Sequence, residues 1–157
     1  MQINATFLGA QPFFKGMPME LLEMLAGEAM PVEFKADELI FKEGAVANRL
    51  YLILSGKIVL ESQTDPEDEP VTIDTIDSGD LLGWSWLFPP YYWLFDARAA
   101  APVKAIFFYG TRLREQCEIN HELGYELMKR VSLVVIDRLQ ATRHCLARQN
   151  RALLMPL

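Results

Sequence analysis

Residues 81–99 read LLGWSWLFPPYYWLFDARA and contain all three tryptophans of the 157-residue chain, Trp84, Trp86 and Trp93. A double proline interrupts this stretch, and proline donates no backbone hydrogen bond and does not fit the interior of a helix. The stretch is therefore neither one regular strand nor one regular helix. We predict a strand, a short helical turn, a loop and a second strand, which together form the floor of a ligand pocket.

Short runs of alternating apolar and polar residues before and after this stretch predict β-strands. The clearest pair is LYLIL at 50–54 and KIVLE at 57–61, which flank Ser55-Gly56 and predict a hairpin with a two-residue turn. Short strands separated by turn residues over about eighty residues predict an antiparallel β-roll, a jelly-roll-like double-stranded β-helix. The other predicted strands cover residues 32–34, 39–41, 71–76, 95–101 and 103–109.

Helical patterns lie on both sides of the predicted roll. Residues 1–16 are expected to form an arm, and Pro18 then opens a short amphipathic helix that Gly27 ends. After Gly110 the pattern is helical again, and no proline interrupts residues 120–150, which would form a helix about 45 Å long. We therefore expect a mainly β protein of the α+β class with a short N-terminal helix and a long C-terminal helix.

The expected organisation is one domain over residues 1–157. Residues 12–110 would form the N-terminal helix and the roll, and residues 111–150 the C-terminal helices. The long helix exceeds what is needed to cover one face of a small roll. We expect its first half to pack on the roll and also to meet the same helix of a second copy, giving a homodimer. A long helix whose polar face is only solvated is the alternative.

The composition excludes several classes of protein. The net charge is −6, whereas a nucleic-acid surface needs a concentrated basic face. Two cysteines, Cys117 and Cys145, make no disulfide framework, and the first residues do not have the pattern of a signal peptide. No apolar run is long enough to span a bilayer. We expect a cytoplasmic protein with neither a membrane nor a DNA partner.

The sequence contains no recognisable catalytic motif. The two histidines, His121 and His144, both fall in the predicted C-terminal helices, so they do not form the inward-facing ligand cluster of a metal-dependent roll enzyme. There is no Ser–His–acid set with a nucleophile elbow and no glycine-rich Walker or dinucleotide loop. We expect no enzymatic activity, no metal and no cofactor, although the pocket could take a cyclic nucleotide or another small ligand.

Three segments carry a resemblance to a known family: IFKEG at 40–44, LYLILSGKI at 50–58 and SGDLLG at 78–83. Together with the flanking helices they resemble the cyclic-nucleotide-binding domain, the sensor module of catabolite-activator-type regulators and of kinase regulatory subunits. The resemblance covers residues 13–149 and is closest to a bacterial branch of small, stand-alone members. It implies positive-φ turns at Gly44, Gly56 and Gly79, with Asp37 in place of another turn glycine.

The family's phosphate-binding cassette reads F-G-E-L, a one-turn helix, and then R-(S/T/A)-A on the next strand. The resemblance implies that the Glu binds the ribose hydroxyl, that helix N-terminal amides hold the phosphate and that the Arg neutralises it. Here Trp84 stands at the position of the Glu. Counting back from the strand at 103–106 places Trp93 at the position of the Arg and Arg98 on the outer face. The alternative takes Arg98-Ala99-Ala100 as the literal R-A-A, with Arg98 contacting the phosphate.

The charges of this region indicate an apolar pocket. No Lys or Arg lies between Lys57 and Arg98, whereas nine Asp or Glu do. An unpaired buried anion is costly, whereas a buried indole contributes a few kcal/mol at about 25 cal/mol per Å². Ser85 is expected either to cap the short helix or to donate to a ligand. The predicted degenerate pocket comprises Leu82, Gly83, Trp84, Ser85, Trp86, Trp93, Leu94 and Phe95.

Three functions remain open at this point. The first is a non-enzymatic regulatory module that does not bind cAMP or cGMP conventionally, senses another ligand and acts on an unknown protein partner. The second is a ligand-free interaction or scaffold module whose pocket is filled by Trp93 and its neighbours. The third is a true cyclic-nucleotide receptor that uses Arg98. DNA binding is not expected, because DNA-binding family members carry a helix-turn-helix after the long helix and only seven residues follow Asn150.

Overall fold

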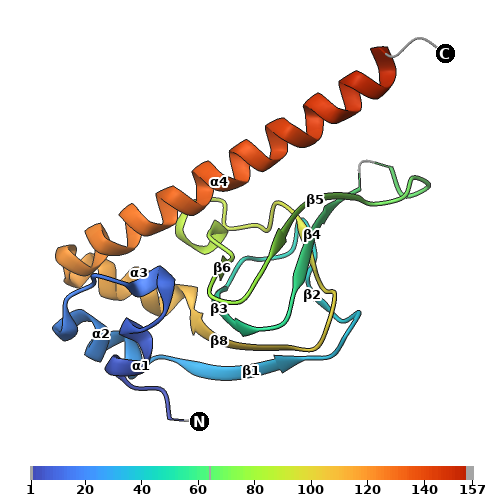
Figure 1. Cartoon of the computed structure of the whole chain (residues 1–157). Coiled ribbons are helices and arrows are strands. Elements are labelled where there is room, and N and C mark those ends of the chain that lie inside the picture. Colours follow the sequence, from blue (N-terminus) through green and yellow to red (C-terminus); the bar gives the residue numbers. More distant parts are fainter. Residues whose placement is uncertain (1, 64, 155–157) are drawn as a thin grey trace.

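The computed structural model describes residues 2–63 and 65–154, and Figure 1 shows short N-terminal helices, a β-roll and one long C-terminal helix. The N-terminal elements are α1 (Ala5–Gly9), the 3-10 turn η1 (Pro12–Phe14) and α2 (Met19–Ala26). The roll contains β1 (Met30–Phe34), β2 (Leu39–Phe41), β3 (Arg49–Ser55), β4 (Ile58–Ser62), β5 (Val71–Ile76), β6 (Leu81–Leu82), the 3-10 turn η2 (Ser85–Leu87), β7 (Asp96–Ala99) and β8 (Val103–Tyr109). The C-terminal helices are α3 (Gly110–Ile119) and α4 (His121–Leu154).

Two antiparallel sheets of four strands each form the roll. Their strand orders are β1-β8-β3-β6 and β2-β7-β4-β5. Alternate residues of each strand therefore point either into the space between the sheets or outward. The predicted fold class, an antiparallel β-roll with a short N-terminal helix and a long C-terminal helix, is confirmed.

Strands β3 and β4 do not form a hairpin, which corrects the prediction made for residues 50–61. β3 pairs with β6 and β8, whereas β4 pairs with β5 and β7. Ser55-Gly56 is the corner at which the chain passes from one sheet to the other. Gly56 has a φ of 101°, and a Cβ at this residue would lie 2.4 Å from the carbonyl oxygen of Pro102. The glycine thus permits a close approach between distant segments, which the local sequence does not reveal.

Residues 2–16 contain the helix α1 and the turn η1 rather than the expected arm. Asn4 caps α1 by accepting a hydrogen bond of 2.8 Å from the main-chain nitrogen of Phe7. Leu8 and Phe14 are buried, so these turns contribute to the core. The next helix, α2, lies where one was predicted and buries Leu21, Leu22 and Leu25.

Buried apolar side chains form two clusters. One lies inside the roll between the two sheets and includes Ile53, Ile58 and Ala99. The other lies between the roll and the helices, where Trp86 and Phe108 meet the N-terminal turns. The first half of α4 contributes Leu123, Leu127 and Val131 to this second cluster.

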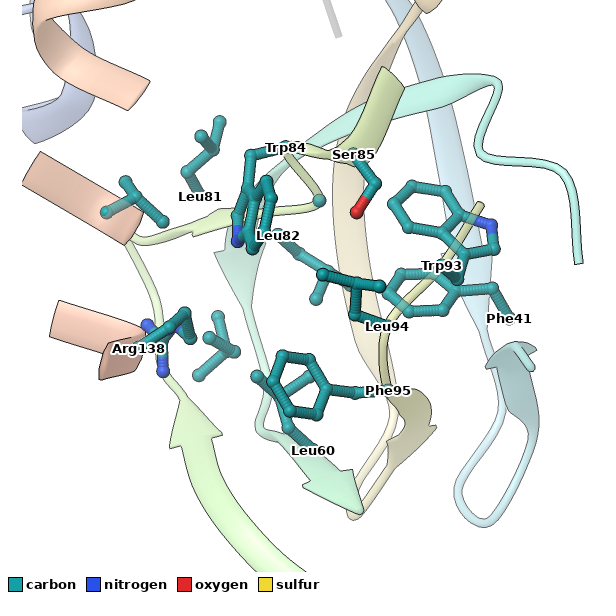
Figure 2. Close-up of a pocket in the computed structure, with 13 residues that line it drawn as sticks. Phe41, Leu60, Leu81, Leu82, Trp84, Ser85, Trp93, Leu94, Phe95 and Arg138 are labelled. Carbon is teal, nitrogen blue, oxygen red and sulfur yellow. The ribbon is translucent and has the colours of Figure 1, made fainter. Parts of the chain in front are cut away.

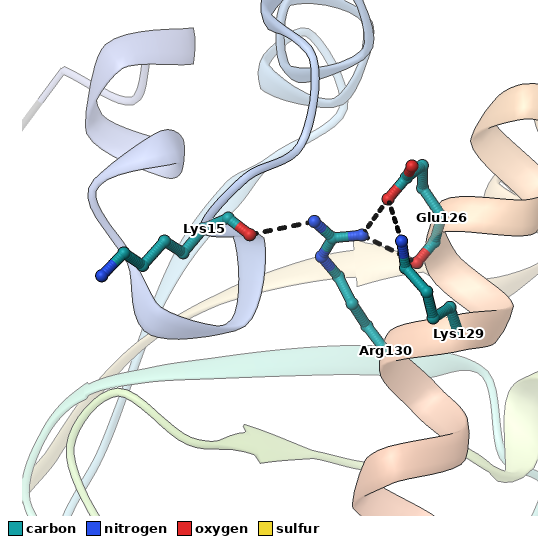
Figure 3. Close-up of polar contacts among 4 residues, drawn as sticks. All are labelled: Lys15, Glu126, Lys129 and Arg130. Atoms are coloured by element: carbon teal, nitrogen blue, oxygen red, sulfur yellow. Dashed lines mark hydrogen bonds and ion pairs between the residues drawn. The ribbon is translucent and has the colours of Figure 1, made fainter.

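Arg130 joins α4 to the N-terminal segment, as Figure 3 shows. Its guanidinium donates to the main-chain oxygens of Lys15, at 3.0 Å, and of Glu126, at 3.1 Å, and it also forms an ion pair with the Glu126 carboxylate. Lys129 Nζ lies 3.4 Å from the same carboxylate. Because Arg130 is only 9% exposed, these contacts fix the first half of α4 against the N-terminal turns.

This ion-pair cluster predicts a pH dependence of stability. The hydrogen bond from Arg130 holds the pKa of Glu126 below its ordinary value of 4.5, and Lys129 acts in the same direction. The contribution of Glu126 is therefore present above pH 4.5 and lost as the pH falls through the lowered pKa. We expect Glu126→Gln to reduce the free energy of unfolding most at neutral pH, with the difference from wild type shrinking below pH 4.5.

Urea unfolding between pH 7 and pH 3 measures this difference. Glu122→Gln, on the same helix, is the control, because Glu122 forms no ion pair within residues 2–63 and 65–154. A constant difference between Glu126→Gln and wild type across the pH range would contradict the prediction.

Candidate functional site

A small cavity lies inside the roll beneath α4, and we call it the roll cavity (Figure 2). Its free volume is about 20 Å³, which is room for about one water molecule. Seven of the eight predicted pocket residues line it: Leu82, Gly83, Trp84, Ser85, Trp93, Leu94 and Phe95. The other lining residues are Phe41, Leu60, Ile76 and Leu81 from the roll, and Val134 and Arg138 from α4.

Trp93 fills one end of the roll cavity. Its indole is buried and lies flat against the ring of Phe41, with centroids 3.8 Å apart and planes inclined by 8°. Main-chain hydrogen bonds hold its backbone, since Trp93 N donates to the oxygen of Ala45 at 2.9 Å and Trp93 O accepts from Gly44 N at 2.8 Å. Trp93 is therefore fixed by both its ring and its backbone.

Gly83 lies against the edge of this indole. Its φ is 93°, and an added Cβ would lie 2.8 Å from Trp93 Cη2 and 3.2 Å from the main-chain oxygen of Arg49. The glycine is thus required both by the backbone conformation and by the space that Trp93 occupies.

Trp84 and Trp86 point to different sides of η2. Trp84 lines the roll cavity and packs edge to face on Phe88, with centroids 6.1 Å apart. Trp86 is fully buried in the core beneath the helices, and its indole nitrogen donates to the main-chain oxygen of Gly83 at 3.0 Å. Trp86 therefore does not line the cavity, which corrects that part of the predicted pocket. The reason is that residues two apart in a 3-10 turn cannot share one face.

Ser85 is buried, with 6% exposure, and lines the roll cavity. It does not cap the short turn, because η2 begins at Ser85 itself and Trp84, the N-cap residue, makes no side-chain capping bond. Figure 2 shows the Ser85 hydroxyl directed into the cavity between the two indoles. The hydroxyl forms no hydrogen bond within the described part of the chain and is not among its fully buried unsatisfied atoms, so it is accessible to water or to a ligand.

Arg98 lies outside the roll cavity. Its neighbours Ala97 and Ala99 are fully buried, so strand alternation places the Arg98 side chain on the outer face of β7. There its guanidinium pairs with Glu61 at 3.2 Å and donates to the main-chain oxygen of Asp37 at 3.0 Å. The side chain is 41% exposed, and this geometry does not fit a phosphate contact inside the roll.

Residues 31–120, more than half of the chain, match the family described as the cyclic nucleotide-binding domain. The chain belongs to this family. The matched range includes the aromatic stretch at 81–99 and ends at the start of α4. The chain is therefore a regulatory module of the cyclic nucleotide-binding type, and the predicted resemblance is confirmed.

Relatives of known structure or annotation share this domain. A protein from Geobacter metallireducens GS-15 named for cyclic nucleotide binding is 33% identical, with a TM-score of 0.78 over 87% of this chain and 98% of that one. The CRP-like cAMP-activated global transcriptional regulator of Mycobacterium tuberculosis is 25% identical over 134 residues, 85% of this chain and 58% of that protein. This chain thus spans a little over half of that regulator.

A third protein is similar to this chain in fold alone. The c-di-GMP-responsive global regulator of Xanthomonas campestris is 13% identical, with a TM-score of 0.72 over 88% of this chain and 66% of that one.

One basic side chain does line the cavity of this cyclic nucleotide-binding domain, and the sequence analysis missed it. Arg138 of α4 is 12% exposed and donates through Nη1 to the carboxylate of Asp74 on β5. Figure 2 shows Arg138 on the same side of the cavity as Trp84, and Trp93 and Phe41 on the opposite side. Position 138 lies four and seven residues after Val134 and Val131, so its helical spacing from these inward-facing residues was the available signal.

A second arginine connects the cassette region to the C-terminal helices. Arg114 of α3 donates to the main-chain oxygen of Trp86, and its guanidinium lies 4.2 Å from the ring centroid of Tyr91. Both contacts join α3 to the turn and loop between β6 and β7. A shift of this loop would therefore be transmitted to α3 through Arg114.

Two further observations concern the described residues, 2–63 and 65–154. No group of three or more His, Cys, Asp or Glu side chains is arranged to hold a metal ion. No helix among them has the length and apolar character needed to cross a membrane.

The contact between Gly83 and Trp93 predicts a stability difference between two glycine variants. Gly83→Ala introduces both a positive-φ strain of about 1–2 kcal/mol and an overpacking cost of about 1–3 kcal/mol against the indole. Gly44→Ala is the control, because Gly44 has a similar φ of 86° but nothing within 4 Å of an added Cβ. Urea unfolding should show a larger loss of unfolding free energy for Gly83→Ala than for Gly44→Ala. Near-UV circular dichroism should show an altered tryptophan signal only for Gly83→Ala. Equal losses would contradict the prediction.

Proposed function

We propose that this chain is a non-enzymatic, ligand-sensing regulatory module whose cavity no longer binds cAMP or cGMP in the conventional way. The observation that carries the proposal is the Trp93 indole stacked on Phe41 inside the roll cavity. In the cyclic-nucleotide-binding pattern that this chain resembles, the phosphate-binding arginine stands at the position that Trp93 occupies here. An indole at this position offers a phosphate no positive charge and at most one N–H donor.

Electrostatics supports the same conclusion. A cyclic phosphate in the roll cavity would lose its hydration, and this cost is repaid only by close basic partners. Arg138 is the one basic side chain that lines the cavity among the described residues, and it is already paired with Asp74. Arg98 points away from the cavity and pairs with Glu61.

The available space also argues against a nucleotide in this conformation. A free volume of about 20 Å³ accommodates about one water molecule. Proteins similar to this chain are named for different ligands, cAMP in Mycobacterium tuberculosis and c-di-GMP in a Xanthomonas campestris protein of the same fold, which supports the view that the fold does not determine the ligand.

We infer that the chain forms a homodimer through α4. Five exposed apolar residues lie along one flank of α4, beside the face that buries Leu127 and Val131, and we call them the α4 stripe. Exposed apolar residues at this spacing on a long helix fit pairing with a second copy. The stripe consists of Tyr125, Met128, Ile136, Leu139 and Leu146.

Signalling would use the two arginines that join the helices to the roll. A ligand that moves η2 would act on α3 through Arg114, and one that moves Asp74 would act on α4 through Arg138. Such a ligand shifts the equilibrium between helix positions by its difference in affinity for them. An unknown protein partner would then recognise the helix position.

A second function has its own support. The filled roll cavity also fits a ligand-free interaction or scaffold module, in which Trp93, Phe41 and Leu94 act only as core. In that case the α4 stripe alone would carry the function.

Titration with cAMP and cGMP, followed by tryptophan fluorescence, tests the main proposal because Trp84 and Trp93 line the cavity. We expect no saturable change for either nucleotide, meaning a Kd weaker than about 1 mM. The Mycobacterium tuberculosis relative provides the positive control. Saturable micromolar binding would overturn the proposal, and its loss in Arg98→Ala would show that Arg98 is the phosphate contact.

Sedimentation velocity tests the homodimer. We expect wild type to be a dimer and Leu139→Glu to be a monomer, because burying a charge in the α4 stripe is costly. His144→Glu introduces the same charge on an exposed side of α4 away from the stripe and should remain dimeric. A monomeric wild type would contradict the homodimer.

A further inference from the structure

We propose that the roll cavity binds an apolar, aromatic carboxylic acid whose carboxylate replaces Asp74 as the partner of Arg138. The inference rests on the proposed sensing function and specifies its ligand class. It stands on three polar side chains that lie in an otherwise hydrocarbon lining, namely Ser85, Trp84 and Arg138.

All three polar side chains offer hydrogen-bond donors. The Ser85 hydroxyl and the Trp84 indole nitrogen bond to no acceptor within residues 2–63 and 65–154, and neither is a fully buried unsatisfied atom, so both remain accessible to solvent. Arg138 has five N–H donors, and in the same part of the chain its side chain bonds only to Asp74, through Nη1. A ligand that supplies acceptors can therefore bond to these donors in place of water.

A carboxylate is the acceptor that fits Arg138. The guanidinium of Arg138 binds the carboxylate of Asp74. A ligand carboxylate would replace this group with one of the same charge and shape. Asp74 is 30% exposed, so it can be rehydrated after the exchange, whereas Arg138 at 12% exposure would be costly to leave unpaired. A ligand with one carboxylate therefore leaves no buried charge uncompensated.

The remaining lining selects an aromatic body. Trp84, Trp93 and Phe95 surround the space beyond Arg138, as Figure 2 shows. Flat apolar rings pack on such walls by offset or edge-to-face contacts. The free volume of about 20 Å³ is too small for a ring, so entry requires a lining side chain to move. We expect Leu94 to be that side chain, because it is 52% exposed and borders solvent.

The exchange also supplies the signal. Arg138 and Asp74 form the ion pair that ties the middle of α4 to β5. When the ligand takes Arg138, this tie is released and α4 is held on β5 by its other contacts, which include the buried Cys145 beside the main-chain oxygen of Thr72. Ligand binding and helix position are then coupled through a single guanidinium.

Calorimetric titration of the full chain with naphthalene-1-acetate and naphthalene-1-acetamide tests the inference, since the two compounds differ only in the charged group. We expect wild type to bind the acid at least tenfold more tightly than the amide. Arg138→Gln should bring the two affinities within about twofold. Asp74→Asn should tighten binding of the acid at least threefold, because it removes the competing carboxylate, and should leave the amide unchanged.

Arg98→Gln is the matched control, since it removes an arginine from the outer face and should leave both affinities unchanged. Asp74→Asn keeps the test valid if Arg138→Gln does not fold. Equal affinities for acid and amide in wild type would overturn this inference and leave the sensing function intact. Failure of both compounds to bind wild type and Asp74→Asn would overturn it and favour the filled, ligand-free cavity.

Discussion

The flat contact between Trp93 and Phe41 is the constraint on which the rest of the site depends. It requires a glycine at position 83, because any side chain there would meet the indole. It also occupies the inner end of the roll cavity and leaves little more than the space of one water molecule. The chain keeps the fold of the cyclic nucleotide-binding domain, and its roll cavity is lined mainly by aromatic and aliphatic side chains.

The fold could be predicted because its strands and turns produce patterns within short stretches of sequence. Strand alternation places Ala97 and Ala99 inside and Arg98 outside, and the glycines at tight turns have positive φ.

The errors of the sequence-based prediction concern contacts between distant segments. The corner at Gly56 depends on Pro102, so the predicted hairpin was wrong. The burial of Trp86 follows from the geometry of η2, which no apolar pattern encodes. Arg138 was missed because it enters the site from a helix whose path over the roll the sequence does not specify.

The basic group that lines the cavity lies on a different element in this chain than in the family pattern. In the family pattern the cation is on the strand that follows the cassette, within the rigid roll. In this chain the only cation lining the cavity of the described structure is on α4 and is held by a carboxylate of β5. A charge on a rigid sheet can bind a ligand without moving, whereas a charge on a helix links binding to the position of that helix. The aromatic lining and the arginine on α4 are thus the two features of the cavity that bear on recognition.

The anchoring of α4 at Arg130 has a mechanical consequence. The ion pairs with Glu126 and the bond to Lys15 hold the helix near its start, while 24 further residues extend from Arg130 to Leu154. At about 1.5 Å per residue this segment is about 36 Å long, so a tilt of about 5° about the anchor would sweep its far end through about 3 Å. Two contacts with β5, the Arg138–Asp74 ion pair and Cys145 beside Thr72, lie along this segment, so a change at either one would bear on the position of its far end.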